Sequence, residues 1–187
     1  MSWLYVAAAS LIIFCAVPFA RVTQSVVSEI FGRSFFLFFL AAVALVASAL
    51  AIRAIRRRAI PRSAYLWLAV IIAALGGYAY KLRGNPEETF HFVEYGLLSL
   101  LVYRALIHRI RDHGVYFIAT VVVGTIGIID EWLQWITPSR YWGVRDLWIN
   151  LLAGAMIQLA IALGLRPRLV SGWPASGTRR AFSRFAA

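Results

Sequence analysis

Residues 130–154 read DEWLQWITPSRYWGVRDLWINLLAG, and this stretch carries acidic, basic and amide side chains between two strongly apolar segments. The polar residues are Asp130, Glu131, Gln134, Arg140, Arg145, Asp146 and Asn150. Groups of this kind are costly to hold in apolar surroundings unless they pair with one another or bind something. The stretch therefore predicts a polar site at the junction of two apolar helices.

The composition of the whole chain predicts an integral membrane protein. Of 187 residues, 61% are hydrophobic and 14% are charged, with a mean hydropathy of +0.75, whereas soluble domains carry about 25% charged residues. Apolar runs recur at residues 3–20, 35–52, 64–80, 90–107, 115–135 and 147–165. Each is close to the roughly 20 residues that a spanning helix needs. We expect an all-α, polytopic membrane bundle of about six transmembrane helices.

Three regions are expected along the chain. Residues 1–80 form an N-terminal three-helix membrane region, residues 81–165 a three-helix core, and residues 166–187 a basic tail. The first apolar run has no basic segment before it and no clear small-residue cleavage site, so we interpret it as a retained span. Cys15 is the only cysteine, so we expect neither an intramolecular disulfide nor a cysteine metal site.

The basic residues predict the orientation in the membrane. Thirteen of the 19 lie in one set of connections and the C-terminal tail, and the other connections hold Arg21, Arg33, Lys81, Arg83, Arg140 and Arg145. The positive-inside rule places the richer set in the cytoplasm, so both termini are predicted to be cytoplasmic. All the acidic residues except Asp112 then lie toward the outer side.

The net charge of +11 is expected for a membrane protein whose basic residues lie beside its spans. The arginines lie between apolar runs and form no basic face with base-stacking aromatic residues, so we expect no nucleic-acid partner. Basic residues beside a span set its orientation and contact lipid headgroups. The membrane itself is the expected partner of these side chains.

Helical spacing gathers polar side chains in each of the last three predicted spans. The sets are His91 with Glu94 and Tyr95, Asp130 with Gln134, and Asp146 with Asn150. Residues three or four apart lie on one face of a helix. At a rise of about 1.5 Å per residue, Glu94, Asp130 and Asn150 should reach one layer near the outer surface.

The same two segments also follow a family pattern. Residues 91–98, HFVEYGLL, place His-Phe before Glu-Tyr and a leucine-rich run, and the second segment supplies Asp130, Glu131, Gln134, Pro138, Arg140, Asp146 and Asn150 in order. In both, the chain resembles the VanZ-like family of small bacterial membrane proteins, over about residues 81–164. It departs from the family pattern at Glu88, where a basic residue is usual, at Ser139, where glycine is usual, and at Gly154, which falls one residue late.

The resemblance implies a multi-pass protein of the bacterial plasma membrane with a role in the cell envelope. The family's namesake is associated with low-level resistance to the glycopeptide teicoplanin. A role in glycopeptide tolerance is therefore one expectation. The resemblance specifies no reaction and no ligand.

Arg140 and Arg145 indicate an anionic ligand. A guanidinium presents a planar fork of donors that matches phosphate or carboxylate. The stretch also holds Trp135, Tyr141, Trp142 and Trp148, residue types that collect at headgroup level. We predict the binding of an anionic envelope lipid, a lipid-linked cell-wall precursor or a lipoglycopeptide. The further contacts expected are Tyr95, Gln134, Asp146 and Asn150.

An intramembrane enzyme that modifies an envelope lipid is the alternative. His91 or Glu94 would be the general acid or base, and Asp130 or Glu131 would activate water, a nucleophile or a metal. The chain has no HExxH or comparable paired-histidine signature, so we predict no metal and no cofactor.

Two further interpretations remain open. The carboxylates could form an ion pair with Arg140 that holds residues 136–145 on the helix ends, because charges within a membrane usually pair. A proton-coupled carrier is disfavoured, because the polar groups cluster on one side and suggest no relay to the other.

Overall fold

The computed structural model describes residues 2–32, 61–82, 85–138, 142–167 and 169–170, with scattered residues between 35 and 53. The described residues form helices and turns, and no strand lies among them. The elements are α1 Ser2–Ala16, the 3₁₀ turn η1 Val17–Phe19, α2 Ala20–Phe31, α4 Arg62–Leu82, α5 Pro86–Leu106, α6 Gly114–Ile136, α7 Val144–Leu159 and the π-helical turn η2 Ala160–Leu165. The expected all-α class is confirmed.

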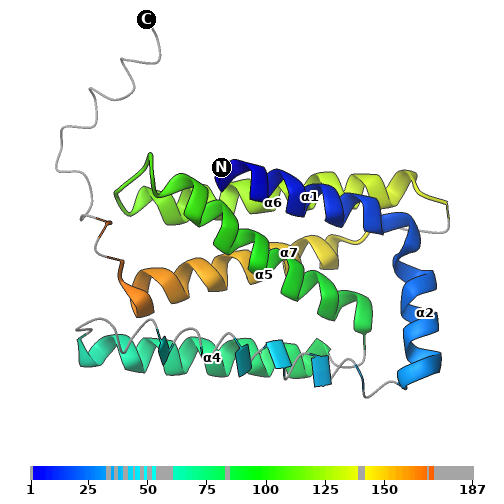
Figure 1. Cartoon of the computed structure of the whole chain (residues 1–187), viewed down its shortest axis with the longest axis horizontal. Coiled ribbons are helices and arrows are strands. Elements are labelled where there is room, and N and C mark those ends of the chain that lie inside the picture. The colour runs from blue at the N-terminus through cyan, green and yellow to red at the C-terminus, as the bar shows by residue number, and fades with distance from the viewer. Residues whose placement is uncertain are drawn as a thin grey trace, which may run out of the picture.

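The helices α4 to α7 run in alternating directions along the long axis of the molecule, and α5 crosses its middle diagonally (Figure 1). Helix α5 contacts α1, α2, α4, α6 and α7, while α6 also packs on α7 and α4 packs on η2. As a result, the start of α5, the end of α6 and the start of α7 lie at one end of the molecule (Figure 1). We call this the polar end, because Asp130, Glu131 and Gln134 in the last turns of α6 and Asp146 and Asn150 in the first turns of α7 lie there.

Four helices in the described part of the chain are long and apolar enough to cross a membrane. They cover Ser2–Phe19, Ser63–Leu82, Gly114–Ile136 and Val144–Leu165, close to four of the expected spans. The expected span at 90–107 is the helix α5, which has 21 residues but is more polar and is not among the four. Helix α5 can be more polar than the other long helices because it lies at the centre, where neighbouring helices can surround its polar side chains.

The expected span at residues 35–52 lies largely outside the described residues. Those that are described between 35 and 53 are helical.

Helix α2 replaces the simple connection expected after the first span. It has 12 residues, or about 18 Å at 1.5 Å per residue, which is too short to span. It lies crosswise to the long helices, at the polar end (Figure 1). Val22, Val26 and Ile30 are exposed and four residues apart, so they form one apolar face, while Ser25 and Glu29 lie to one side of it. This pattern is typical of a helix at the surface of a membrane.

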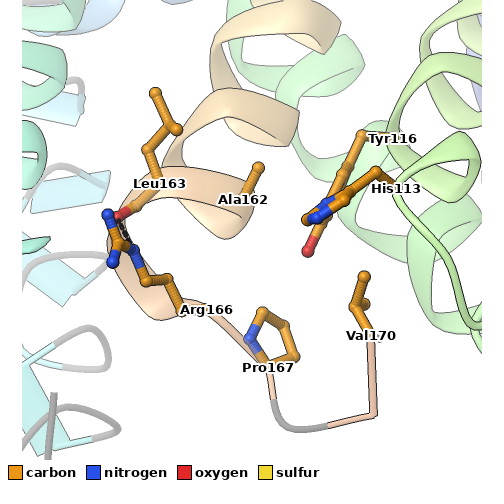
Figure 2. Close-up of a pocket in the computed structure, with 7 residues that line it drawn as sticks. All are labelled: His113, Tyr116, Ala162, Leu163, Arg166, Pro167 and Val170. Atoms are coloured by element: carbon orange, nitrogen blue, oxygen red, sulfur yellow. Dashed lines mark hydrogen bonds between the residues drawn. The ribbon is translucent and has the colours of Figure 1, made fainter. Parts of the chain in front are cut away.

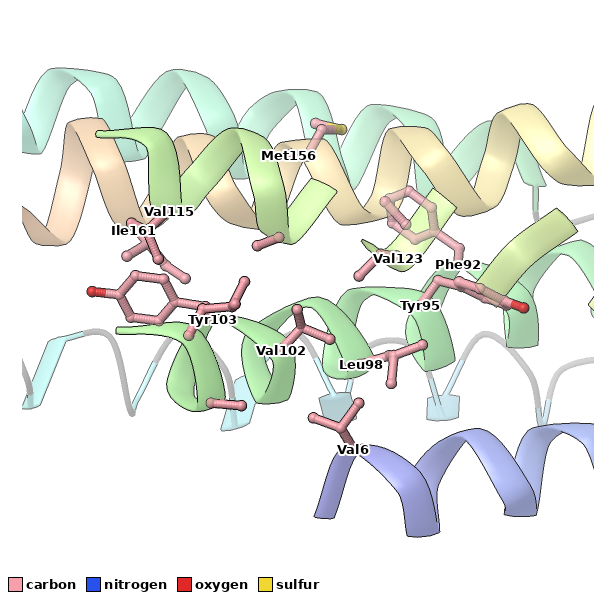
Figure 3. Packing of buried hydrophobic residues seen from close by; sticks show 14 of the residues in the cluster. Val6, Phe92, Tyr95, Leu98, Val102, Tyr103, Val115, Val123, Met156 and Ile161 are labelled. Atoms are coloured by element: carbon pink, nitrogen blue, oxygen red, sulfur yellow. The ribbon is translucent and has the colours of Figure 1, made fainter. Parts of the chain in front are cut away.

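The core lies between α5, α6 and α7. Figure 3 shows Leu98 and Val102 of α5 packed with Val123 of α6, and Met156 of α7 close by. A glycine makes this close packing possible, because a Cβ atom on Gly154 would lie 2.9 Å from Cγ1 of Val123. Real Cβ atoms essentially never approach so closely, so α6 and α7 could not keep this separation with alanine at that position.

Candidate functional site

Three helices bring a set of polar side chains together at the polar end. Helix α5 supplies His91, Glu94 and Tyr95, α6 supplies Asp130, Glu131 and Gln134, and α7 supplies Asn150. We call this set the polar layer. Asp130, Glu131 and Asn150 are fully buried, and Gln134 is 2% exposed. Burial of so many polar groups requires that they interact with one another or with a ligand.

Gln134 joins the two neighbouring carboxylates of α6. Its Nε2 atom donates to Oδ2 of Asp130 at 3.3 Å and to Oε1 of Glu131 at 3.2 Å. Adjacent helical residues point about 100° apart, so a residue three and four positions further along can lie between them. The amide thus gives each of the two buried carboxyl groups a hydrogen-bond donor.

The other carboxylate oxygen of Glu131 binds the loop that leads from α6 to α7. Oε2 accepts a hydrogen bond from the backbone N–H of Gly143 at 3.0 Å. Gly143 directly precedes the first residue of α7. Glu131 therefore sets where α7 begins, and with it the position of Asn150 two turns further along.

His91 lies against the carboxylate of Asp130. The distance from Nδ1 to Oδ2 is 3.7 Å, which is longer than a hydrogen bond, and the side chain of His91 is 11% exposed. The ring of Tyr95 has its centre 6.2 Å from that of His91. The charges of Glu94 and Asp130 are near enough to interact. An imidazole facing a buried carboxylate is an arrangement that suits proton transfer.

Asn150 is fully buried, and neither amide atom has a hydrogen-bond partner among the described residues. The side chain packs against Gly127 and Tyr95: a Cβ atom built on Gly127 would lie 3.3 Å from Cβ of Asn150 and 3.4 Å from Cε1 of Tyr95. A buried amide without partners costs about 1–3 kcal/mol. Asn150 therefore keeps its capacity to bind a polar group within the polar layer.

Arg145 lies at the surface, outside the polar layer. Its Nη2 atom is 2.8 Å from Oε2 of Glu88, and the side chains are 62% and 12% exposed. The pair joins the first turn of α7 to the first turn of α5. Asp146 is half-buried and lies over Gly143, and its carboxylate is in the first turn of α7, where the helix dipole favours a negative charge.

The remaining sequence-based candidates divide in two groups. Arg140 and its neighbours Ser139 and Tyr141 lie outside the described residues, so the structure contains no test of an ion pair with Arg140. Trp135, Trp142 and Trp148 are exposed, as expected for aromatic residues at a membrane surface. Within the described part of the chain, no three His, Cys, Asp or Glu side chains are placed to hold a metal ion.

A second buried polar group escaped the sequence analysis. Oγ of Ser99 donates to the carbonyl of Gly154 at 2.9 Å, and Nε2 of Gln158 lies 2.7 Å from Oγ of Ser99 and donates to its carbonyl at 3.0 Å. Both side chains are buried. A signal existed, because Ser99 follows Tyr95 by four residues and Gln158 follows Asn150 by eight within an apolar run.

A pocket of about 430 Å³ lies at the opposite end of the bundle (Figure 2). Its walls are His113, Tyr116, Ala162, Leu163, Arg166, Pro167 and Val170. Arg166 closes η2 with a left-handed backbone, φ 41°, and its Nε donates to the carbonyl of Leu163 at 3.0 Å.

No family model, curated protein or solved structure matches this chain. Three carboxyl groups, an imidazole, a phenol and two amides lie together at the polar end, and a guanidinium lies at the rim. Such a site can exchange protons, and it can bind a ligand that has both an anionic group and hydrogen-bonding groups.

Proposed function

We propose that the chain is a VanZ-like, multi-pass protein of the bacterial plasma membrane whose outer end binds an anionic envelope lipid, a lipid-linked cell-wall precursor or a lipoglycopeptide. The order of residues in 91–98 and 130–150 supports the family. Four apolar helices support the membrane, and the distribution of basic residues supports cytoplasmic termini. With that orientation the polar end faces outward.

The observation that carries the proposal is the amide of Asn150, which has no hydrogen-bond partner among the described residues and lies on α7 five residues inward from Arg145 of the Arg145–Glu88 pair. Arg145 is 62% exposed, and Glu88, which is 12% exposed, also accepts a hydrogen bond from Nδ2 of Asn85 at 2.9 Å that it keeps when Arg145 turns away. A phosphate can therefore take the place of Glu88 at the guanidinium of Arg145 at little cost, with bidentate geometry. Arg140, which lies outside the described residues, is the second guanidinium proposed for this role.

The carboxyl groups of the polar layer determine which part of the ligand can enter this layer. Glu94, Asp130 and Glu131 repel a phosphate, so the phosphate stays at the rim. The hydroxyl or amide groups of a headgroup can donate to the carboxylates and bind the amide of Asn150. We therefore propose a ligand with its anion outermost and its uncharged polar groups innermost.

The test is to purify the protein in mild detergent and identify the lipids that accompany it by mass spectrometry. We expect one anionic or lipid-linked species to be enriched with the wild type and lost with Arg140→Ala or Arg145→Ala. Arg109→Ala is the matched control, because Arg109 is also exposed but lies at the opposite end. Equal lipid profiles for all four proteins would refute headgroup binding.

A lipid-modifying enzyme is the second candidate, and the distance of 3.7 Å between His91 and Asp130 favours it. His91 would transfer the proton, and Asp130 would orient the imidazole and stabilise its charged form. His91→Gln should then leave the bound lipid in place but prevent its conversion. If the lipid that accompanies the wild type is chemically unchanged after incubation, and is identical with His91→Gln, the enzyme is excluded.

A further inference from the structure

Two stripes of side chains face each other along the axis of the bundle. On α5 the stripe is Tyr95, Ser99 and Tyr103, and on α7 and η2 it is Asn150, Gly154, Gln158 and Ala162. The members are four residues apart, which keeps them on one helix face. The hydrogen bonds from Ser99 to Gly154 and from Gln158 to Ser99 join the stripes at their middle.

The middle of these stripes can both donate and accept hydrogen bonds. Ser99 is fully buried, Gln158 is 3% exposed, and Oε1 of Gln158 has no hydrogen-bond partner among the described residues. The same holds for both amide atoms of Asn150, about 12 Å further along at 1.5 Å per residue. Hydrogen-bonding groups that could hold water are therefore present at two levels of the bundle, at Asn150 and at Gln158.

The inner end of the stripes reaches the pocket. Ala162, one turn beyond Gln158, lines the pocket together with Tyr116, His113 and Arg166 (Figure 2). The rings of Tyr103 and Tyr116 stack with centres 5.8 Å apart. Figure 3 shows the hydroxyl groups of Tyr95 and Tyr103 pointing toward opposite ends of the bundle.

The outer end of the stripes reaches the titratable groups of the polar layer. Helix α5 contributes His91 and Glu94, and α6 contributes Asp130 and Glu131. Helix α7 contributes the uncharged Asn150. No charged side chain lies on the stripes between these groups and the pocket.

We propose that the two stripes form a proton path between the outer carboxylates and the inner pocket. A proton binds at the His91–Asp130 pair and moves inward from one water molecule to the next. Asn150, Ser99 and Gln158 hydrogen-bond and orient this water without themselves changing protonation, and the proton leaves past Tyr116 and His113. The pH difference or the membrane potential drives it, and no other reactant is needed. The proposal rests on the membrane orientation proposed above but does not require headgroup binding.

Packing and charge favour protons over larger ions. Between α5 and α7, Oγ of Ser99 bonds directly to the carbonyl of Gly154 at 2.9 Å, and a Cβ atom on Gly154 would lie 3.8 Å from the same Oγ, so the two helices are close together at the middle of the path. A metal ion would need several oxygen ligands or compensating charges in place of its water. The sequence suggested no polar groups between the outer side and the inner side, and the Ser99–Gln158 contact places two buried polar side chains there.

The experiment is proton flux through the full chain in liposomes that contain a pH-sensitive dye. A potassium gradient with valinomycin sets the potential. We expect the wild type to acidify the lumen faster than protein-free liposomes, and Gln158→Leu and Ser99→Ala to lose this flux. Thr125→Val is the control and should keep the wild-type rate, since Thr125 is exposed and bonds only the Val121 carbonyl of its own helix.

Two outcomes would overturn the proton path. One is a wild-type rate equal to that of protein-free liposomes, and the other is a wild-type rate that survives both Ser99→Ala and Gln158→Leu. Circular dichroism and gel filtration report whether each variant folds, and if Gln158→Leu does not fold, Ser99→Ala decides. Arg145→Ala separates the two proposals, because it should lose the lipid and keep the flux.

Discussion

Glu131 accepts a hydrogen bond from the backbone N–H of Gly143 at 3.0 Å, and this contact joins the last turn of α6 to the start of α7. The same side chain accepts from Gln134 through its other oxygen. Glu131 is therefore the residue that connects the polar layer to the loop between the two helices. A carboxylate in this position has an architectural role whatever ligand the site binds.

Replacing Glu131 should destabilise the polar end. Glu131→Leu leaves the Gly143 N–H and one donor of Gln134 without acceptors, which costs about 1–3 kcal/mol for each buried group. Thermal unfolding in detergent, followed by gel filtration, should show a lower midpoint. Glu29→Ala is the control, because Glu29 is exposed on α2. Equal midpoints for the two variants would contradict the role given to Glu131.

The packing of α6 on α7 should depend on Gly154. Gly154→Ala places a Cβ atom 2.9 Å from Cγ1 of Val123, and overpacking of this kind costs about 1–3 kcal/mol. Adding Val123→Ala should restore much of the lost stability, since it removes the overlapping methyl group. Gly76→Ala should be tolerated, because a Cβ atom there meets nothing within 4 Å. A thermal midpoint of Gly154→Ala equal to that of the wild type would refute the overlap.

Helix α2 should lie in the surface of the membrane with its apolar face toward the lipid. A fluorescent probe on Ile30→Cys, in a Cys15→Ser background, should be quenched by spin-labelled acyl chains. The same probe on Ser25→Cys should be quenched much less, because positions 25 and 30 are separated by about 140° around the helix at 100° per residue. Equal quenching at the two positions would argue against an interfacial helix.

Headgroup binding at Arg145 should be sensitive to salt. The side chain is 62% exposed, and the screening length falls from about 10 Å at 0.1 M salt to about 3 Å at 1 M. The amount of anionic lipid retained by the wild type should therefore fall as salt is raised during purification. Retention that is unchanged at 1 M salt would place the anion away from the exposed guanidinium.

Teicoplanin tolerance tests the role that the proposed VanZ-like family implies. Expression of the chain in a sensitive host should raise the lowest teicoplanin concentration that prevents growth, and Arg145→Ala should abolish the increase. A variant at the other end, Arg109→Ala, should behave as the wild type does. If the wild type gives no increase although it reaches the membrane, this protein has no part in glycopeptide tolerance.

Local sequence was sufficient for the helices and for the faces of the polar residues. The apolar runs of α1, α4, α6 and α7 have the length of a span, and these lengths reappear in the structure. Asp130 and Gln134 share a face because the helical repeat alone determines it, and their side chains meet at 3.3 Å. The sequence did not indicate α2, because its apolar residues are few and interrupted by polar ones.

The contacts between side chains of different helices could not be predicted from the sequence and are seen only in the tertiary structure. The approach of His91 to Asp130, the bond from Gly143 to Glu131 and the joining of Ser99 to Gln158 each connect residues that are 12 or more positions apart. The orientation of Arg145 toward Glu88 was likewise unexpected. Helical periodicity determines which side chains share a face, whereas the crossing of α5 and the small volume of Gly127 and Gly154 determine which faces meet and how closely.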